Sequence, residues 1–184
     1  MIGNDIVDLQ LAKKQSNWQR PGFLDKQYSK KEQQEILSSE SPFLKVWVFW
    51  SMKEAAYKCY LKEHKKRFFA PKKFQCTTIS SDQGFVNIAG KKYFIKIDIT
   101  KKYIHSVATE RKHLSFKSKS FFLEGKNESK EVKFNLLDQF SDTVKVYKDP
   151  IGIPFLKENN RKLPFSISTS HHGKFGSFAI SSLL

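Results

Sequence analysis

The sequence has little cysteine and no long apolar run. Cys59 and Cys76 are the two cysteines among 184 residues, which is too few for a disulfide framework, and they lack the companion ligands of a zinc site. No stretch is apolar for long enough to span a bilayer, and the first residues do not combine a basic segment with an apolar one, as a secretion signal does. We therefore expect a protein of the reducing cytoplasm with no membrane partner.

The sequence also lacks the motifs of several large enzyme classes. It contains no Gly-x-Gly-x-x-Gly fingerprint, no Walker loop, no His-Glu-x-x-His helix and no Gly-x-Ser-x-Gly elbow. These absences argue against dinucleotide-binding enzymes, P-loop nucleotidases, zinc hydrolases and α/β-hydrolases.

Negative charge is scarce relative to positive charge. Lys and Arg number 33 against 18 Asp and Glu, a formal net charge of +15, which attracts anionic partners and speeds their encounter. Charge alone does not separate a nucleic acid, a phosphate-bearing cofactor, an acidic protein and a plain solvated basic surface. The length suits a single domain over residues 1–184, and 17 Phe residues indicate an aromatic-rich core.

Hydrophobic and turn patterns predict a mixture of strands and helices. A strand begins at Ile2 with Asp5 at or near its end, and Ser29 with Glu32 has the form of a helix-opening capping box. Helices are expected at 30–37, from 42 to about 63, and at 132–140. Strands are expected at 77–79, 85–88, 92–100, 103–109, 144–147, 165–168 and 175–181, and a polar loop with a short strand at 112–130.

The long predicted helix carries a carboxylate among aromatic side chains. Glu54 falls at helical spacing from Trp47, Trp50 and Tyr57, and Lys58 follows it by one turn. A Glu–Lys pair at this spacing is usually a modest helix-stabilising ion pair. The aromatic neighbours suit a partly buried carboxylate that binds a metal or takes a proton, so Glu54 and Lys58 are the candidate catalytic residues.

Asp5, two residues after Gly3, is a second candidate carboxylate. Taken alone, it is typical of a helix cap or a turn. Joined to Glu54, it gives two carboxylates, the usual protein share of a magnesium site whose other ligands are water and substrate phosphate. Asp5 and Glu54 are therefore the candidate Mg²⁺ ligands.

A polar segment near the C-terminus, Ser168-Thr169-Ser170-His171-His172-Gly173, lies between two predicted strands. Adjacent Ser and His residues rarely face each other, which disfavours a catalytic triad, and the two histidines lack the further ligands of zinc. A hydroxyl, an imidazole and turn amides at one loop suit phosphate. Ser170 and His171 are therefore candidate binders of a phosphate-bearing cofactor.

Taken in order, these segments resemble the motifs of the 4′-phosphopantetheinyl transferase superfamily, most closely its short holo-acyl carrier protein synthase branch. The matching residues lie at 3–8 (Gly-x-Asp-Ile-Val-Asp), 23–32 (Phe-Leu-x-x-x-Tyr-Ser-x-x-Glu), 50–58 (Trp-x-x-Lys-Glu-Ala-x-x-Lys), 152–154 (Gly-x-Pro) and 168–175 (Ser-x-Ser-His-x-x-x-Phe). The resemblance covers roughly 1–60 and 145–181. An extended or inserted middle region, about 67–131, is not explained by it.

The resemblance implies an α+β fold in which a long helix packs on an antiparallel sheet. It implies transfer of 4′-phosphopantetheine from coenzyme A to a serine of an apo acyl carrier protein, which releases adenosine 3′,5′-bisphosphate. Asp5 and Glu54 would hold Mg²⁺, Glu54 would take the serine proton, and Lys58, Ser170 and His171 would hold coenzyme A phosphates.

The resemblance also implies partners and limits. An acidic acyl carrier protein would be steered to the basic enzyme, with Arg20 and Lys26 as docking candidates. Val7 stands where the larger surfactin-type branch has a second acid, so one acidic ligand fewer is expected. The short branch builds its site between subunits of a trimer, whereas the longer middle region here could complete the site in a monomer.

The competing prediction is a basic, non-enzymatic nucleic-acid-binding module. Phe residues interleaved with Lys in 112–130 favour it. It accounts for the charge but not for Asp5 in its motif or Glu54 among aromatic residues, since carboxylates repel phosphate unless a metal intervenes. We therefore do not expect nucleic acid to be the partner.

Overall fold

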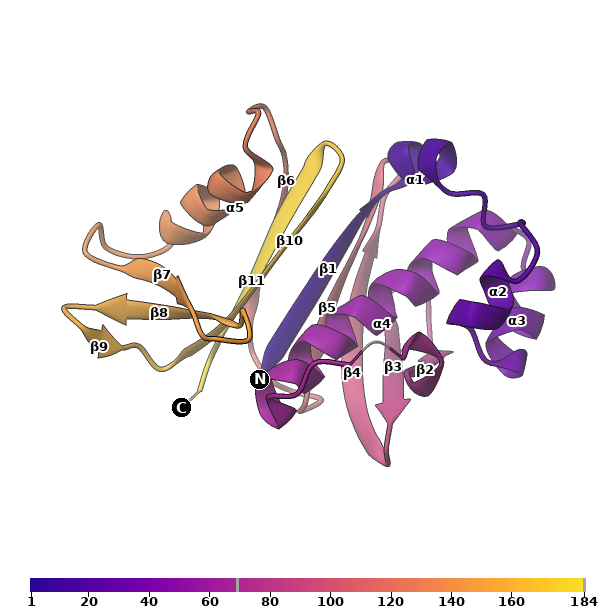
Figure 1. Ribbon diagram of the computed structural model, residues 1–184, viewed down its shortest axis with the longest axis horizontal. Helices are drawn as coiled ribbons and strands as arrows, with labels where there is room; N and C mark the ends of the chain where they lie inside the picture. The colour runs from indigo at the N-terminus through magenta and orange to yellow at the C-terminus, as the bar shows by residue number, and fades with distance from the viewer. Residues whose placement is uncertain (69, 184) are drawn as a thin grey trace.

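Antiparallel sheets and one long helix organise the chain, which the computed structural model describes over residues 1–68 and 70–183 (Figure 1). The first sheet has the spatial order β1 (Ile2–Asp8), β5 (Tyr103–Thr109), β4 (Lys91–Ile99), β3 (Gln83–Ile88) and β2 (Gln75–Thr78). The second has the order β10 (Phe165–His172), β11 (Phe175–Ser182) and β6 (Lys117–Phe122). A small third sheet joins β7 (Lys145–Lys148), β8 (Pro154–Glu158) and β9 (Arg161–Lys162). The predicted α+β class is confirmed.

Helices cover faces of these sheets. They are α1 (Leu9–Gln15), α2 (Phe23–Gln27), α3 (Lys30–Leu37), α4 (Pro42–His64) and α5 (Glu128–Leu137), with a short 3₁₀ turn η1 (Pro71–Lys73). The long helix α4 packs across the first sheet, and α5 lies against β10 and β11 (Figure 1). The predicted capping box of Ser29 and Glu32 is present at α3. Among the described residues, no helix is both long and apolar enough to cross a membrane.

Several predicted boundaries are wrong, each for a local reason. The helix expected at 132–140 begins at Glu128, because the Asn127 side chain caps it by accepting the Lys130 N–H. Asp5 lies in the middle of a strand, because β1 pairs with β5 as far as Asp8. The segment at 168–173 is mostly strand, since β10 continues to His172. Helices α1 and α2 were not predicted.

The outer edge of β1 is satisfied by side chains in place of a paired strand. One edge of β1 makes main-chain pairs with β5. The other edge faces β10, and its backbone N–H groups donate to β10 side chains: Ile2 to Ser166, Asn4 to Ser168, Ile6 to Ser170 and Asp8 to His172. Lys62 and Lys58 of α4 donate to the carbonyl oxygens of Ile2 and Asn4. We call this contact the β1–β10 seam, and it gives the buried backbone groups the partners they require.

Gly3 lets α4 lie directly on β1. A Cβ at this position would lie 2.1 Å from the carbonyl oxygen of Ala55 and 2.6 Å from the backbone nitrogen of Cys59. Both atoms belong to the backbone of α4, so no side-chain rotation could relieve the collision. The helix and the strand would have to move apart.

Gly3→Ala should therefore lower the free energy of unfolding by about 2 kcal/mol or more, as overpacking of a core does. Gly125→Ala is the matched control, because a Cβ there meets the end of the Glu131 side chain at 3.1 Å, which needs to shift by only a few tenths of an ångström, and the Asn127 nitrogen at an ordinary 3.9 Å. Urea denaturation of both variants measures the difference. Equal stabilities would show that the contact between α4 and β1 is not tight.

Candidate active site

Asp5, at the middle of β1, is held by side chains of two other elements, α4 and β10. Its Oδ1 accepts hydrogen bonds from Lys58 Nζ of α4 at 3.2 Å and from Ser170 Oγ of β10 at 2.9 Å. Its main-chain oxygen accepts one from Ser51 Oγ at 3.4 Å. The Asp5 side chain is only 12% exposed. Asp5 is therefore held in place by hydrogen bonds from two other elements.

Glu54 is close enough to Asp5 for the two carboxylates to repel each other. Burial raises the pKa of Glu54 to about 7; the charge of Asp5 also raises it, while Lys58 opposes the shift. Glu54 lines a small cavity with Tyr57, Phe68 and Phe74; the Tyr57 ring meets the other two edge to face, and the two Phe rings stack. Glu54 is thus partly buried beside aromatic rings. Phe68 and Phe74 come from beyond α4, so helical spacing could not reveal them.

Lys58 pairs with Asp5 and not with Glu54. In the part of the chain that the structure describes, the helical ion pair considered for Glu54 and Lys58 does not form. The Lys58 ammonium donates to the Asn4 carbonyl at 2.8 Å as well as to Asp5, and its side chain is 29% exposed. Lys58 therefore crosses from α4 to β1 and places a positive charge beside both carboxylates.

Ser170 and His171 lie on opposite faces of β10. Neighbouring residues of a strand alternate between faces, so Ser170 contacts β1 while the His171 Nδ1 lies 2.9 Å from a carboxylate oxygen of Glu128 at the start of α5. The expectation that one loop gathers both side chains is therefore wrong, while phosphate binding by either residue stays a prediction. The candidate active site, as the structure assembles it within one chain, comprises Asp5, Glu54, Lys58 and Ser170.

Two further motif residues, Glu32 and Lys53, hold α4 in place; residue pattern marked Glu32 only as part of a capping box and did not mark Lys53. The Lys53 ammonium donates to Glu32 at 2.9 Å and to the main-chain oxygens of Pro71 and Phe74, and both charged side chains are 2% exposed. Glu32 also accepts the N–H groups of Ser29 and Cys76. A buried ion pair is tolerated when such bonds satisfy it. This one ties α3 to α4 and so orients the helix that carries Glu54.

The donor set fits a hard cation with few protein ligands. Asp5 and Glu54 supply carboxylate oxygens, which Mg²⁺ prefers. Among the described residues, no three His, Cys, Asp or Glu side chains gather as a metal site, so the other ligands would be water or substrate. A cation would also relieve the repulsion that raises the pKa of Glu54.

Comparison with known proteins identifies one family. A family model described as the 4′-phosphopantetheinyl transferase superfamily matches residues 1–115. No curated protein matches the chain. The match includes Asp5, Glu54 and Lys58, and it extends over 67–115, which the motifs alone left unexplained. It ends before Ser170 and His171.

In the metal-free protein, the raised pKa of Glu54 should make folding stability fall as the pH rises. The carboxyl ionises near 4.5 in the unfolded chain and only near 7 in the folded one, so between these pH values the folded state holds more protons. From pH 4.5 to 7, the free energy of unfolding of the parent should fall by about 2 to 3 kcal/mol more than that of Glu54→Gln. Denaturation in a chelator measures this difference, and a difference that stays constant with pH would contradict the raised pKa.

Proposed function

The chain belongs to the 4′-phosphopantetheinyl transferase superfamily, and from this premise we propose that it transfers 4′-phosphopantetheine from coenzyme A to a serine of an apo acyl carrier protein. Membership implies a phosphopantetheinyl transferase that uses coenzyme A; the carrier protein and the use of Mg²⁺ are our proposal. The main support is the convergence of Asp5, Glu54 and Lys58, from two separate motifs, at one partly buried place.

The proposed reaction is a displacement at phosphorus. The serine Oγ bonds to the β-phosphorus of coenzyme A, and the bond from that phosphorus to the bridging oxygen breaks. Adenosine 3′,5′-bisphosphate leaves with the electron pair, and the serine proton passes to Glu54. In the metal-free protein, burial raises the pKa of Glu54 to about 7, and the same burial favours uptake of a proton, as a general base requires.

Asp5 and Glu54 are the residues that would hold Mg²⁺. When bound, Mg²⁺ supplies positive charge to the pyrophosphate as its bonding changes. Lys58 would bind a phosphate oxygen on the same side, because its ammonium is partly exposed beside Asp5. Phosphoryl transfer depends mainly on positioning and electrostatics, which these three side chains provide.

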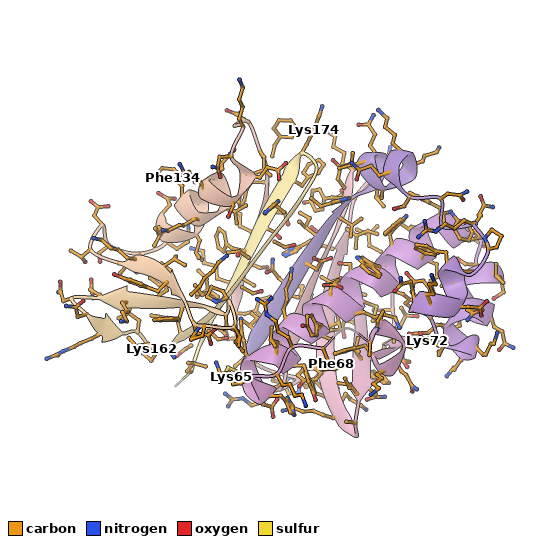
Figure 2. The ribbon with its side chains drawn as sticks, in the orientation of Figure 1. Lys65, Phe68, Lys72, Phe134, Lys162 and Lys174 are labelled. Atoms are coloured by element: carbon orange, nitrogen blue, oxygen red, sulfur yellow. The ribbon has the colours of Figure 1, made fainter. Side chains whose placement is uncertain are left out.

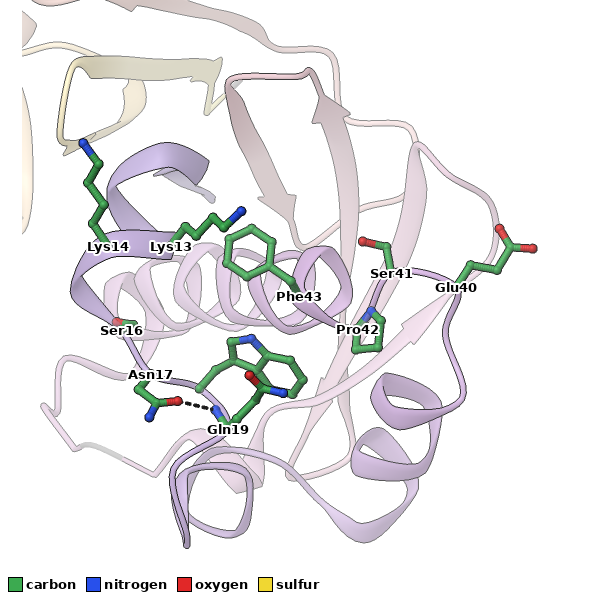
Figure 3. Close-up of a pocket in the computed structure, with 10 residues that line it drawn as sticks. Lys13, Lys14, Ser16, Asn17, Gln19, Glu40, Ser41, Pro42 and Phe43 are labelled. Atoms are coloured by element: carbon green, nitrogen blue, oxygen red, sulfur yellow. Dashed lines mark hydrogen bonds between the residues drawn. The ribbon is translucent and has the colours of Figure 1, made fainter.

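A groove beside α1 is the proposed docking surface for the carrier protein. It has a volume of about 760 Å³ and lies between α1 and the start of α4. Lys13 and Lys14 supply positive charge, and Trp18 and Phe43 supply aromatic surface (Figure 3). The two elements that line the groove also connect it to the candidate active site. Helix α1 directly follows β1, which carries Asp5, and Glu54 lies about 16 Å along α4 from Phe43.

Arg20 and Lys26, the docking residues proposed from the sequence, are exposed on the connection after α1 and on α2. They would extend the basic surface of this groove toward an acidic carrier protein. Basic side chains also lie away from this groove: Lys162 of β9 is at the opposite end of the molecule from α2 (Figure 1 and Figure 2). Lysines elsewhere on the protein can therefore serve as controls.

The reaction is tested by the intact mass of apo acyl carrier proteins incubated with the protein, coenzyme A and Mg²⁺. We expect a gain of one phosphopantetheine that a chelator prevents.

Glu54→Gln should lower the rate of transfer by about 100-fold or more, the usual contribution of a general base. Asp5→Asn should raise the Mg²⁺ concentration that transfer requires. Lys58→Ala should raise the KM for coenzyme A. Asp25→Asn, an exposed charge change, is the control and should transfer at the parent rate.

Transfer by Glu54→Gln or Asp5→Asn at the parent rate would exclude the proposed metal site. A folded parent that binds coenzyme A but modifies no carrier protein in the panel would point to a different acceptor.

Docking is tested by charge reversal at the groove. Lys13→Glu/Lys14→Glu should raise the KM for carrier protein by about tenfold and leave the KM for coenzyme A unchanged, because like charges would face the acidic partner. Lys145→Glu/Lys148→Glu makes the same change in net charge on exposed positions of β7. Equal effects of both pairs would mean that the overall field, and not the groove, attracts the carrier.

A further inference from the structure

Ser170 contacts the Asp5 carboxylate from the far side of the β1–β10 seam. We propose that Ser170 is a positioning residue, whose hydroxyl orients Asp5 for metal binding. The inference rests on the proposed function, because it concerns the metal site of that reaction. It gives Ser170 a role different from the phosphate binding that the sequence indicates.

The hydroxyl proton of Ser170 already takes part in a hydrogen bond to Asp5. Ser170 Oγ lies 2.9 Å from Asp5 Oδ1, and it accepts the Ile6 N–H at 3.3 Å. An ionised carboxylate can only accept, and a serine has a single O–H proton, so Ser170 donates to Asp5. The residue is 7% exposed. It therefore has neither a free proton nor open access with which to bind a phosphate.

The contacts to Asp5 are unequal between its two carboxylate oxygens. Ser170 and Lys58 both donate to Oδ1. Within the described residues, no hydrogen bond to Oδ2 is found. A carboxylate rotates over a broad range when nothing restrains it. Two donors on one oxygen fix that rotation and leave the other oxygen for a cation, as hydrogen bonds to metal-ligating carboxylates do.

The other seam serines lack this contact. Ser166 and Ser168 each accept one β1 N–H through Oγ, from Ile2 at 3.1 Å and from Asn4 at 3.0 Å. The Ser166 hydroxyl also lies near the Met1 sulfur, at 3.9 Å. Ser168 is 2% exposed and sits two residues before Ser170 on the same face of β10. Replacing Ser168 therefore removes the same kind of backbone contact but spares Asp5.

The test measures Mn²⁺ affinity by electron paramagnetic resonance of the full chain in the presence of coenzyme A. Ser170→Ala should weaken Mn²⁺ binding by about tenfold or more, the usual effect of removing a hydrogen bond to a ligating residue. Ser168→Ala should bind Mn²⁺ like the parent. Ser170→Thr keeps the hydroxyl on a strand-compatible residue and should restore the affinity. Thermal denaturation of each variant shows that it is folded, and half-saturating Mg²⁺ for transfer should rise in parallel.

Three outcomes would overturn the proposal. Parent affinity in Ser170→Ala would show that the hydroxyl does not orient Asp5. An equal loss in Ser168→Ala would mean that any damage to the seam loosens the site. A parent that binds no Mn²⁺ would remove the metal site itself, and its transfer of phosphopantetheine, measured separately, would show whether the proposed function survives.

Discussion

The need of β1 for partners on both edges governs this structure. A buried strand requires partners for its N–H and C=O groups, and in the described part of the chain only one edge of β1 pairs with another main chain. Serine hydroxyls and an imidazole of β10, with two lysines of α4, complete the other edge. The second sheet and the long helix are thus fixed to the same strand. Asp5 lies where all three meet.

In this arrangement, single side chains contact both the backbone of β1 and the Asp5 carboxylate. The Lys58 ammonium serves the backbone of β1 and the Asp5 carboxylate at once, and Ser170 does the same from the opposite side. Glu54 is left with a raised pKa, because burial and Asp5 outweigh the effect of Lys58. The scaffold holds two carboxylates together at an electrostatic cost that a proton or a cation relieves.

Local patterns predicted the local parts of this site well. The capping box at Ser29, the start of α4 at Pro42 and a partly buried Glu54 on that helix follow from spacing and residue type. The contacts between distant segments did not follow. Strand alternation places Ser170 and His171 on opposite faces, which the turn-like residue types of this segment do not indicate. Phe68 and Phe74 reach Glu54 only through tertiary packing, which no periodicity encodes.

The backbone contact at Gly3 has a consequence for how the molecule moves. Because no rotatable side chain separates α4 from β1 there, thermal fluctuations should carry the helix and the strand together as one rigid body. The seam on the other edge of β1 is made of individual side-chain contacts from serine, histidine and lysine that can break and re-form one at a time. Breathing motions should therefore concentrate at the seam, so that the second sheet swings against β1 while the spacing between Asp5 and Glu54 stays constant.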